Sequence, residues 1–349
     1  MTRAGAGLGD FPALYPDAIN IDTIPDMRFN SGRVGGSAGY YQTNLHPFSN
    51  VNETYDAILN LTKIWGSHNT KFGVYFQHSY KAQSAFASHN TQISFIDSTS
   101  NPYDSNFGYA NAALGIFNTF TQANKYARPE YVYTNVEWYA QDNWKVNNKL
   151  TLDYGVRFYA LTPQWDESLQ VSTFLPDRWS ASNAPPLYVP GLDSSGKRVG
   201  VDPATGNTVV ERFIGRLVPP TTDAQRFNGT AQPGQDINDR LYSGTAFKIS
   251  PRLGVVYDLT GEGRTIVRGG FGIFYDRPQG NTVFNTVLTP PSMLNPSLTW
   301  GTLQNLTAST SDPYAPLGGM QPTAYDFIPP RVTAWNVGIQ HKLMHAIVL

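Results

Sequence analysis

Residue types that support covalent or metal chemistry are few in this sequence and poorly spaced. The chain of 349 residues has six histidines and no cysteine, which excludes thiolate metal sites and a cysteine nucleophile. His341 and His345 are four residues apart, but they fall in an expected hairpin rather than on a metal-binding helix. No Ser-His-Asp arrangement or distinguished pair of carboxylates can be recognised. The sequence therefore predicts no enzyme, no metal site and no cofactor.

Two further motifs have simple structural explanations. The segment Arg268-Gly269-Gly270-Phe271-Gly272 resembles a glycine-rich phosphate loop, but it lacks the following Lys-Ser/Thr and does not open a helix. The segments 193–196 and 202–206 resemble calcium loops only in part, and their Asp and Gly residues are typical of β-turns. The formal net charge of -1 provides no basic field for nucleic acid, so no nucleic-acid partner is expected.

The dominant signal is the alternation of apolar and polar residues in unusually long strands. Between Val132 and Ala160, apolar side chains recur at even positions on both sides of a tight turn at 146–149. Side chains alternate with a period of two along a strand, so this pattern predicts a sheet with one apolar and one polar face. Soluble strands usually have about 5–6 residues, whereas a strand that crosses a bilayer needs roughly 9–11. The hairpin is typical of a transmembrane β-barrel.

We therefore predict an all-β fold, an antiparallel transmembrane β-barrel that is incomplete, with about ten strands in an open fragment and long extracellular loops. Residues 1–50 are expected to form a loop or linker, and residues 51–349 a partial barrel domain. Beyond the two strands of the 131–159 hairpin, strands are expected near 53–65, 70–83, 91–98, 116–126, 250–259, 264–276 and 331–343. The chain begins without a signal-peptide core and ends like the start of a strand, so we interpret it as an internal fragment of a larger protein.

The lengths of the connections predict an orientation. Tight connections fall near 66–69, 146–149, 260–263 and 344–345, and very long ones at 163–249 and 277–330. In outer-membrane barrels the short turns face the periplasm and the long loops face outside. This arrangement puts the FGYANAALG segment (107–115) on the periplasmic side. It also puts Trp65, Trp144 and Tyr257 beside the periplasmic turns, where they would form an aromatic girdle.

Several strings of residues resemble those of TonB-dependent outer-membrane receptors, and most closely the Oar-like group. They are EWYAQDNWKVNNKLTLDYGVRFYAL (137–161), SPRLGVVYDLTGEGRTIVRGGFGIFYDR (250–277), HNTKFGVYF (68–76), FGYANAALG and TAWNVGIQHKL (333–343). The resemblance covers roughly residues 50–349. Two hallmarks are missing, namely an N-terminal plug with a TonB-contacting box and a C-terminal strand that ends in an aromatic residue. The family barrel has about 22 strands and a plug, so this chain would supply under half of it.

The resemblance implies that external loops capture a ligand and that TonB then displaces a plug to import it. The implied location is the outer membrane of a Gram-negative-type bacterium. The implied partners are outer-membrane lipid, the TonB complex through a plug absent from this chain, and an unknown small ligand, oligosaccharide or peptide. Exposed aromatic residues often mark binding surfaces, although they could instead pack the loops together. The loop aromatics are Trp165, Trp179, Tyr188, Trp300 and Tyr314.

The alternation also predicts which side chains line the lumen, where charges can border a transport path or pair across strands. These residues are Asn135, Glu137, Asp153, Arg157, Arg252 and Arg268. Two other functions remain open. The chain could be an outer-membrane adhesin or passive barrel without TonB coupling. It could also be a soluble β-rich carbohydrate-active protein, which would need shorter strands, repeats of about 40–50 residues and a pair of carboxylates.

Overall fold

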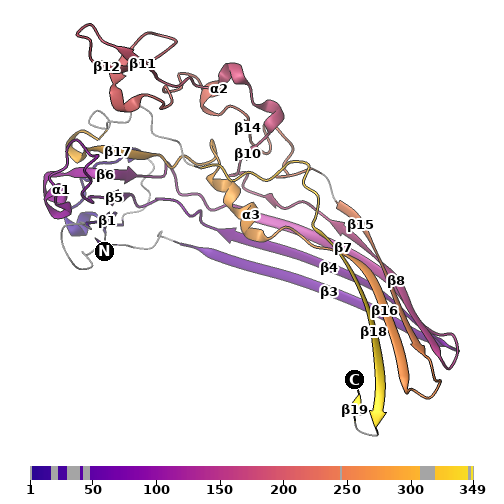
Figure 1. Cartoon of the computed structure of the whole chain (residues 1–349). Helices are drawn as coiled ribbons and strands as arrows, with labels where there is room; N and C mark the ends of the chain where they lie inside the picture. Colours follow the sequence, from indigo (N-terminus) through magenta and orange to yellow (C-terminus); the bar gives the residue numbers. More distant parts are fainter. Residues whose placement is uncertain are drawn as a thin grey trace.

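A long curved sheet and a group of shorter elements at one end of it make up the molecule (Figure 1). The structure is a computed structural model that describes residues 2–16, 23–29, 40–41, 48–243, 246–306, 319–344 and 347–348. The chain is predominantly β, as the alternation predicts. Among the described residues, no helix is both long and apolar enough to cross a membrane.

The large sheet is antiparallel throughout and is open in the part of the chain that the structure describes. Its strands follow the order β19-β18-β16-β15-β8-β7-β4-β3, and β9 adds a short pairing to β7. Sequence neighbours joined by a tight turn are also neighbours in the sheet, so the sheet is a series of hairpins. The strands are β3 (Asn50–Trp65), β4 (His68–Gln83), β7 (Glu130–Lys145), β8 (Leu150–Leu161), β9 (Trp165–Asp166), β15 (Ala246–Asp258), β16 (Thr265–Tyr275), β18 (Arg331–Met344) and β19 (Ile347–Val348).

The two faces of this sheet differ as the sequence predicts. On one face, the residues that pair across neighbouring strands are apolar, as in the pairs Trp138 with Phe158 and Phe271 with Trp335. Among the described residues no second layer covers this face, and most of its apolar side chains are exposed, for example Leu59 at 73%. A monomeric soluble protein rarely exposes so large an apolar surface. The arrangement therefore agrees with contact to lipid rather than to water.

The described tight turns, near 66–69, 146–149 and 260–263, lie at one end of the large sheet, and the long connections lie at the other (Figure 1). The turn predicted at 344–345 includes His345, which lies outside the described residues. The β3–β4 turn consists of Gly66 and Ser67, and Gly66 has a φ of 58°. Positive φ at the first position suits the primed turns whose twist matches that of the strands, and glycine adopts it without steric cost. The common side of the turns agrees with the orientation predicted from loop length.

The shorter elements form a cap at the end with the long connections. A five-stranded sheet has the order β17-β6-β5-β1-β2, and β11, β12 and β13 form a separate three-stranded sheet. The cap strands are β1 (Asp26–Arg28), β2 (Tyr40–Tyr41), β5 (Gln92–Ser94), β6 (Ile116–Thr121), β10 (Thr173–Phe174), β11 (Val189–Leu192), β12 (Arg198–Val201), β13 (Thr208–Val210), β14 (Thr230–Ala231) and β17 (Ser297–Thr302). The helices are α1 (Gly108–Leu114), α2 (Asp223–Arg226), α3 (Gly280–Phe284) and the 3-10 turns η1 (Ala4–Ala6), η3 (Pro176–Arg178), η4 (Ala181–Asn183), η5 (Glu211–Phe213), η6 (Asn285–Leu288) and η7 (Leu303–Asn305).

Three sequence-based expectations about this cap are wrong. The segments 91–98 and 116–126 do not join the large sheet, because β4 pairs directly with β7. Their strands are short, and Phe117 and Phe120 of β6 are both fully buried three residues apart, which is not the alternation of a two-faced strand. The helix α1 within FGYANAALG consequently lies at the loop end and not beside the tight turns (Figure 1). Residues before Asn50, expected as loop, contribute β1 and β2 to the cap sheet.

We expect an arginine on the apolar face to destabilise the sheet in a bilayer. Trp335 is 76% exposed on this face, level with Leu253 of β15 and four residues further from the tight turns than Tyr257, and its neighbour Asn336 lies on the polar face. The Trp335→Arg substitution should lower the free energy of unfolding in lipid vesicles by about 2–4 kcal/mol, because a charge near the bilayer midplane is costly. Denaturant titration of the full-length protein in vesicles would measure the change. Asn336→Arg is the matched control and should have little effect, and equal losses in both variants would contradict the assignment of the faces.

Candidate functional site

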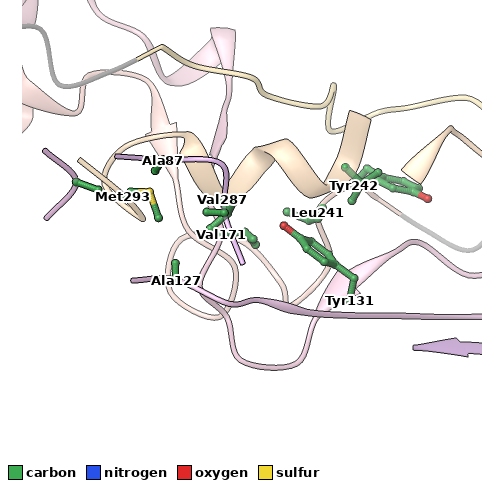
Figure 2. Close-up of a cluster of buried hydrophobic side chains, with 11 residues drawn as sticks. Ala87, Ala127, Tyr131, Val171, Leu241, Tyr242, Val287 and Met293 are labelled. Carbon is green, nitrogen blue, oxygen red and sulfur yellow. The ribbon is translucent and has the colours of Figure 1, made fainter. Parts of the chain in front are cut away.

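Three long connections fold together into one hydrophobic core above the large sheet. Figure 2 shows this core, to which the segments 84–129, 162–245 and 276–330 all contribute side chains. Tyr131 at the cap end of β7 anchors the core to the sheet, and its hydroxyl donates to the carbonyl of Phe284 at 2.9 Å. The core residues are Ala85, Ala87, Ala123, Ala127, Tyr131, Val171, Leu241, Tyr242, Val283, Val287 and Met293. The three long connections therefore form one folded cap rather than three separate loops.

Two buried polar side chains hold the backbone of the segments 84–129 and 162–245 in place through hydrogen bonds. Asp166 is fully buried, and its carboxylate accepts the backbone N–H groups of Glu130 at 2.6 Å and Gln170 at 2.5 Å. His89 is also buried, with Nε2 at 2.8 Å from the carbonyl of Ala85 and Nδ1 at 3.1 Å from that of Lys125. Burial lowers the pKa of the His89 imidazole below its ordinary value of 6.5, although both carbonyls act in the opposite direction.

A groove of about 670 Å³ lies where the cap meets the polar face of the large sheet. Its volume falls in the range of small-molecule pockets, roughly 300–1,000 Å³. The cap side consists of Gln164, the segment 276–280 and Phe284 next to it. The sheet side consists of residues from the cap ends of β3, β4 and β7, namely Asn52, Thr54, Ser79, Lys81, Tyr131 and Tyr133.

Lys81 of β4 lines this groove, and its ammonium group donates two hydrogen bonds to neighbouring side chains. Its Nζ donates to Oδ1 of Asn50 and of Asn52, both at 2.8 Å, and lies 4.9 Å from the centre of the Phe284 ring. An ammonium group has three donors, so within the described residues one N–H is left for a ligand.

Arg277 supplies a second cation and joins the cap to the sheet. Its Nη1 donates to the Thr162 carbonyl at 2.6 Å, its Nη2 donates to Oδ1 of Asn135, and the guanidinium lies 4.1 Å from the centre of the Tyr133 ring. Burial lowers the pKa of this guanidinium from its usual value, while the hydroxyls of Tyr242 and Tyr133 act in the opposite direction. Arginine remains charged in proteins, so the groove keeps two positive charges.

The six residues predicted to line a lumen all lie on the polar face, as the strand registers place them. Arg157 forms an ion pair with Glu137, with an Nη2–Oε2 distance of 2.5 Å. Asn143 donates to Asp153 at 3.5 Å, and the guanidinium of Arg252 lies 4.8 Å from the centre of the Phe274 ring. Arg268 lies opposite Gly338 of β18. The face therefore combines one close ion pair with cations held against aromatic rings.

The opposite, apolar face has a band of aromatic and polar side chains beside the tight turns. The ring centroid of His68 lies 5.9 Å from that of Trp65 and 5.2 Å from that of Trp144. Nδ1 of His68 lies 2.6 Å from Oδ2 of Asp142, which also accepts the hydroxyl of Tyr154 at 2.9 Å. The carboxylate of Asp142 on this face is thus hydrogen-bonded by its neighbours, as an apolar setting requires.

Comparison with known protein families shows which surroundings the apolar and the polar face have. The chain matches the outer membrane beta barrel domain family over residues 2–349. It belongs to this family. The protein is accordingly located in the bacterial outer membrane, and proteins of this family are usually not enzymes. No curated protein matches the chain.

In an outer-membrane barrel the apolar face meets lipid and the polar face lines the lumen. The predicted girdle residues Trp65 and Trp144 occupy the band beside the turns, and Tyr257 lies on the same face of β15 opposite Leu150. The exposed apolar face also argues against a soluble carbohydrate-active protein, because such a surface would aggregate in water. No group of three or more potential metal ligands occurs among the described residues.

The predicted ligand-binding aromatics are not brought together. Trp179 is exposed at 49%, whereas Tyr188 is buried at 6% and packs within the cap. Trp165 is half-buried under Arg240, whose guanidinium lies 4.8 Å from its ring centre, and the indole of Trp300 donates to Asn118 at 3.1 Å. Tyr314 lies outside the described residues. Of the described four, only Trp179 is exposed as predicted, because the loops use the other three to pack.

Lys81, Arg277 and the contribution of the segment 84–129 were not predicted from the sequence. The alternation along β4 already places Lys81 on the polar face, so its orientation could have been predicted. Arg277 follows the end of β16, and nothing local to the sequence indicates that it contacts Asn135. Asp142 lies at an even position of β7 and therefore on the apolar face, where the alternation does not predict a charged residue.

We expect the cap to become less stable as the pH falls below about 6.5, the ordinary histidine pKa. The pKa of His89 is lower in the folded cap, so the unfolded state binds a proton first and the stability present above this pH is lost as the pH decreases. Amide protection factors across 84–129, which are corrected for the intrinsic pH dependence of exchange, should decrease at mildly acidic pH. His89→Gln should weaken this decrease, and His341→Gln on the large sheet should preserve it. Protection factors that are independent of pH in the unaltered protein would contradict the expectation.

Proposed function

We propose that this chain forms part of the barrel wall and the external cap of an Oar-like, TonB-dependent receptor. The cap captures a ligand, and energy delivered through TonB displaces a plug and admits the ligand to the lumen. The observation that carries this proposal is the groove between the cap and the polar face, which connects the outer surface to the lumen wall. The plug and the TonB-contacting segment would belong to the full-length protein.

The folded cap supports a receptor over a simple pore. Three long segments here share one hydrophobic core, and α3 lines the groove together with the cap ends of β4 and β7. Functional residues commonly lie on loops held by a rigid scaffold. We propose that the cap carries the ligand specificity and that the six polar-face residues described above line the path inward.

An adhesin is the second candidate, and the β11–β13 sheet favours it. This sheet lies at the end of the molecule away from the tight turns (Figure 1), and it exposes Val189, Leu192 and Val210 at 43%, 69% and 48%. Exposed apolar side chains on an outermost module suit attachment to another surface. An adhesin of this kind would need no TonB coupling, so coupling separates the two candidates.

Contact with TonB tests the proposal without knowledge of the ligand. In cells that express the full-length protein, formaldehyde should cross-link it to TonB, and dissipation of the proton gradient should change the yield. A variant without residues 187–217 removes the exposed module between the paired residues Leu187 and Leu217 and should keep the cross-link. If no cross-link forms while the protein is inserted and abundant, the receptor proposal fails and the adhesin is favoured.

Trypsin added to intact cells should cut the β11–β13 module and spare the tight turns. Lys197 and Arg198 are exposed in the module, and Lys149 and Arg264 are exposed at the turns, so both ends offer cleavable sites. Only the external end is accessible to the protease before lysis. Mass spectrometry of the fragments, before and after lysis, gives the answer. Cleavage at Lys149 or Arg264 in intact cells would reverse the orientation and place the groove on the wrong side of the membrane.

A further inference from the structure

Positive charge predominates on the polar face of the large sheet. The registers of the seven long strands place twice as many lysines and arginines as carboxylates there, although the chain as a whole has a net charge of -1. The cations are Lys71, Lys81, Lys145, Arg157, Lys248, Arg252, Arg268 and Lys342, and the carboxylates are Asp56, Glu137, Asp153 and Asp258. A surface of one sign attracts ligands of the opposite sign.

Most of these cations are not neutralised by the protein. Within the described residues, Arg157 alone among them forms an ion pair, with Glu137. Others lie against aromatic rings, such as Arg252 near Phe274 and Lys248 at 5.9 Å from the centre of the Tyr275 ring. Rings attract a cation without removing its charge, so an anion can still bind there.

The groove at the cap end of this face is also lined by cations that lack a carboxylate partner among the described residues. Lys81 and Arg277 both line it, and within the described residues neither forms an ion pair with a carboxylate. Asp276 also lines the groove, but it is exposed and its Oδ1 accepts the backbone N–H of Arg277 at 2.8 Å. Tyr131, Tyr133 and Phe284 add aromatic surface beside the two cations.

We propose that this groove binds a small organic anion, a carboxylate with an attached aromatic or apolar group, and that the cationic polar face accepts it next. The carboxylate would receive the remaining N–H of Lys81 and compensate the charge of Arg277, while its apolar part lies against the rings of Tyr133 and Phe284. Hydrogen bonds between charged partners are about twice as strong as neutral ones, so an anion is preferred over a neutral analogue. This inference names the ligand class of the receptor proposed above and rests on that proposal.

The size of the groove favours a small ligand over a polymer. Its volume of about 670 Å³ accommodates a molecule of a few rings. An acidic peptide or an acidic oligosaccharide would extend beyond the groove and depend on contacts elsewhere on the cap. These two classes are therefore outcomes of the test and not parts of the proposal.

The test uses the purified full-length protein in detergent and calorimetric titration with 2-naphthoate. The neutral 2-naphthamide and a cationic 2-naphthyl trimethylammonium serve as matched probes of similar shape. We expect 2-naphthoate to bind at least about tenfold more tightly than either matched probe, which corresponds to about 1.4 kcal/mol. Its affinity should fall as the salt concentration rises, because exposed charges are screened.

Variants of β4 locate the site. Lys81→Gln should weaken 2-naphthoate binding about tenfold, and Lys81→Arg should largely restore it, because the positive charge returns. Lys149→Gln is the control, since Lys149 is exposed at a tight turn and belongs neither to the groove nor to the polar-face cations. Its affinity should stay within about twofold of the unaltered protein.

Several results would overturn the inference. These are equal binding of 2-naphthamide, no loss in Lys81→Gln, no detectable binding of 2-naphthoate, or binding of triglutamate or trigalacturonate in its place. The titration requires no TonB, so it is independent of the cross-linking test of the receptor proposal. Anion binding without a TonB contact would indicate a passive anion-binding barrel, whereas a TonB contact without anion binding would leave a receptor for another ligand class.

Discussion

Hydrogen bonding of the backbone in a medium without water is the constraint on which the rest of this structure depends. Within hydrocarbon, N–H and C=O groups must pair inside the protein, which leaves helices and closed sheets as the possible spanning structures. The uninterrupted register from Asn50 to Gln83 and on through β7 and β8 satisfies this requirement over long strands. Long paired strands force side chains to alternate, and the alternation creates one apolar face and one polar face. Irregular backbone is consequently confined to the ends of the strands.

The cap at one of these ends obeys the rules of a water-soluble domain. Its five-stranded sheet has a core of its own, in which Ile93, Phe117 and Phe120 are almost completely buried, and the core around Tyr131 joins it to the large sheet. The same chain therefore buries apolar side chains inward in the cap and presents them outward in the sheet. This reversal coincides with the change of solvent from water to lipid, because apolar surface is favoured wherever water is excluded.

Charge follows the same division. On the apolar face Asp142 is held by hydrogen bonds with His68 and Tyr154, whereas on the polar face most cations lack a carboxylate partner among the described residues. Water in a lumen solvates such cations at little cost, while lipid does not. The boundary between cap and sheet combines charged and apolar groups, since Lys81 and Arg277 lie against the rings of Phe284 and Tyr133 and keep their charge. This combination makes the boundary the most distinctive chemical feature of the molecule.

The sequence by itself determined the large sheet and its two faces, because alternation, strand length and turn residues are local properties that the bilayer converts directly into structure. These local properties account for the hairpins and for the common end of the tight turns. They also place Asn135, Arg157 and Arg268 on one face. The cap could not be predicted in this way, because its short strands and the contact of Arg277 with Asn135 join residues far apart in sequence. Local pattern contains no information about such contacts, so only the tertiary structure decided that 91–98 and 116–126 leave the wall, that Tyr188 is buried, and that a groove forms where three loops meet the sheet.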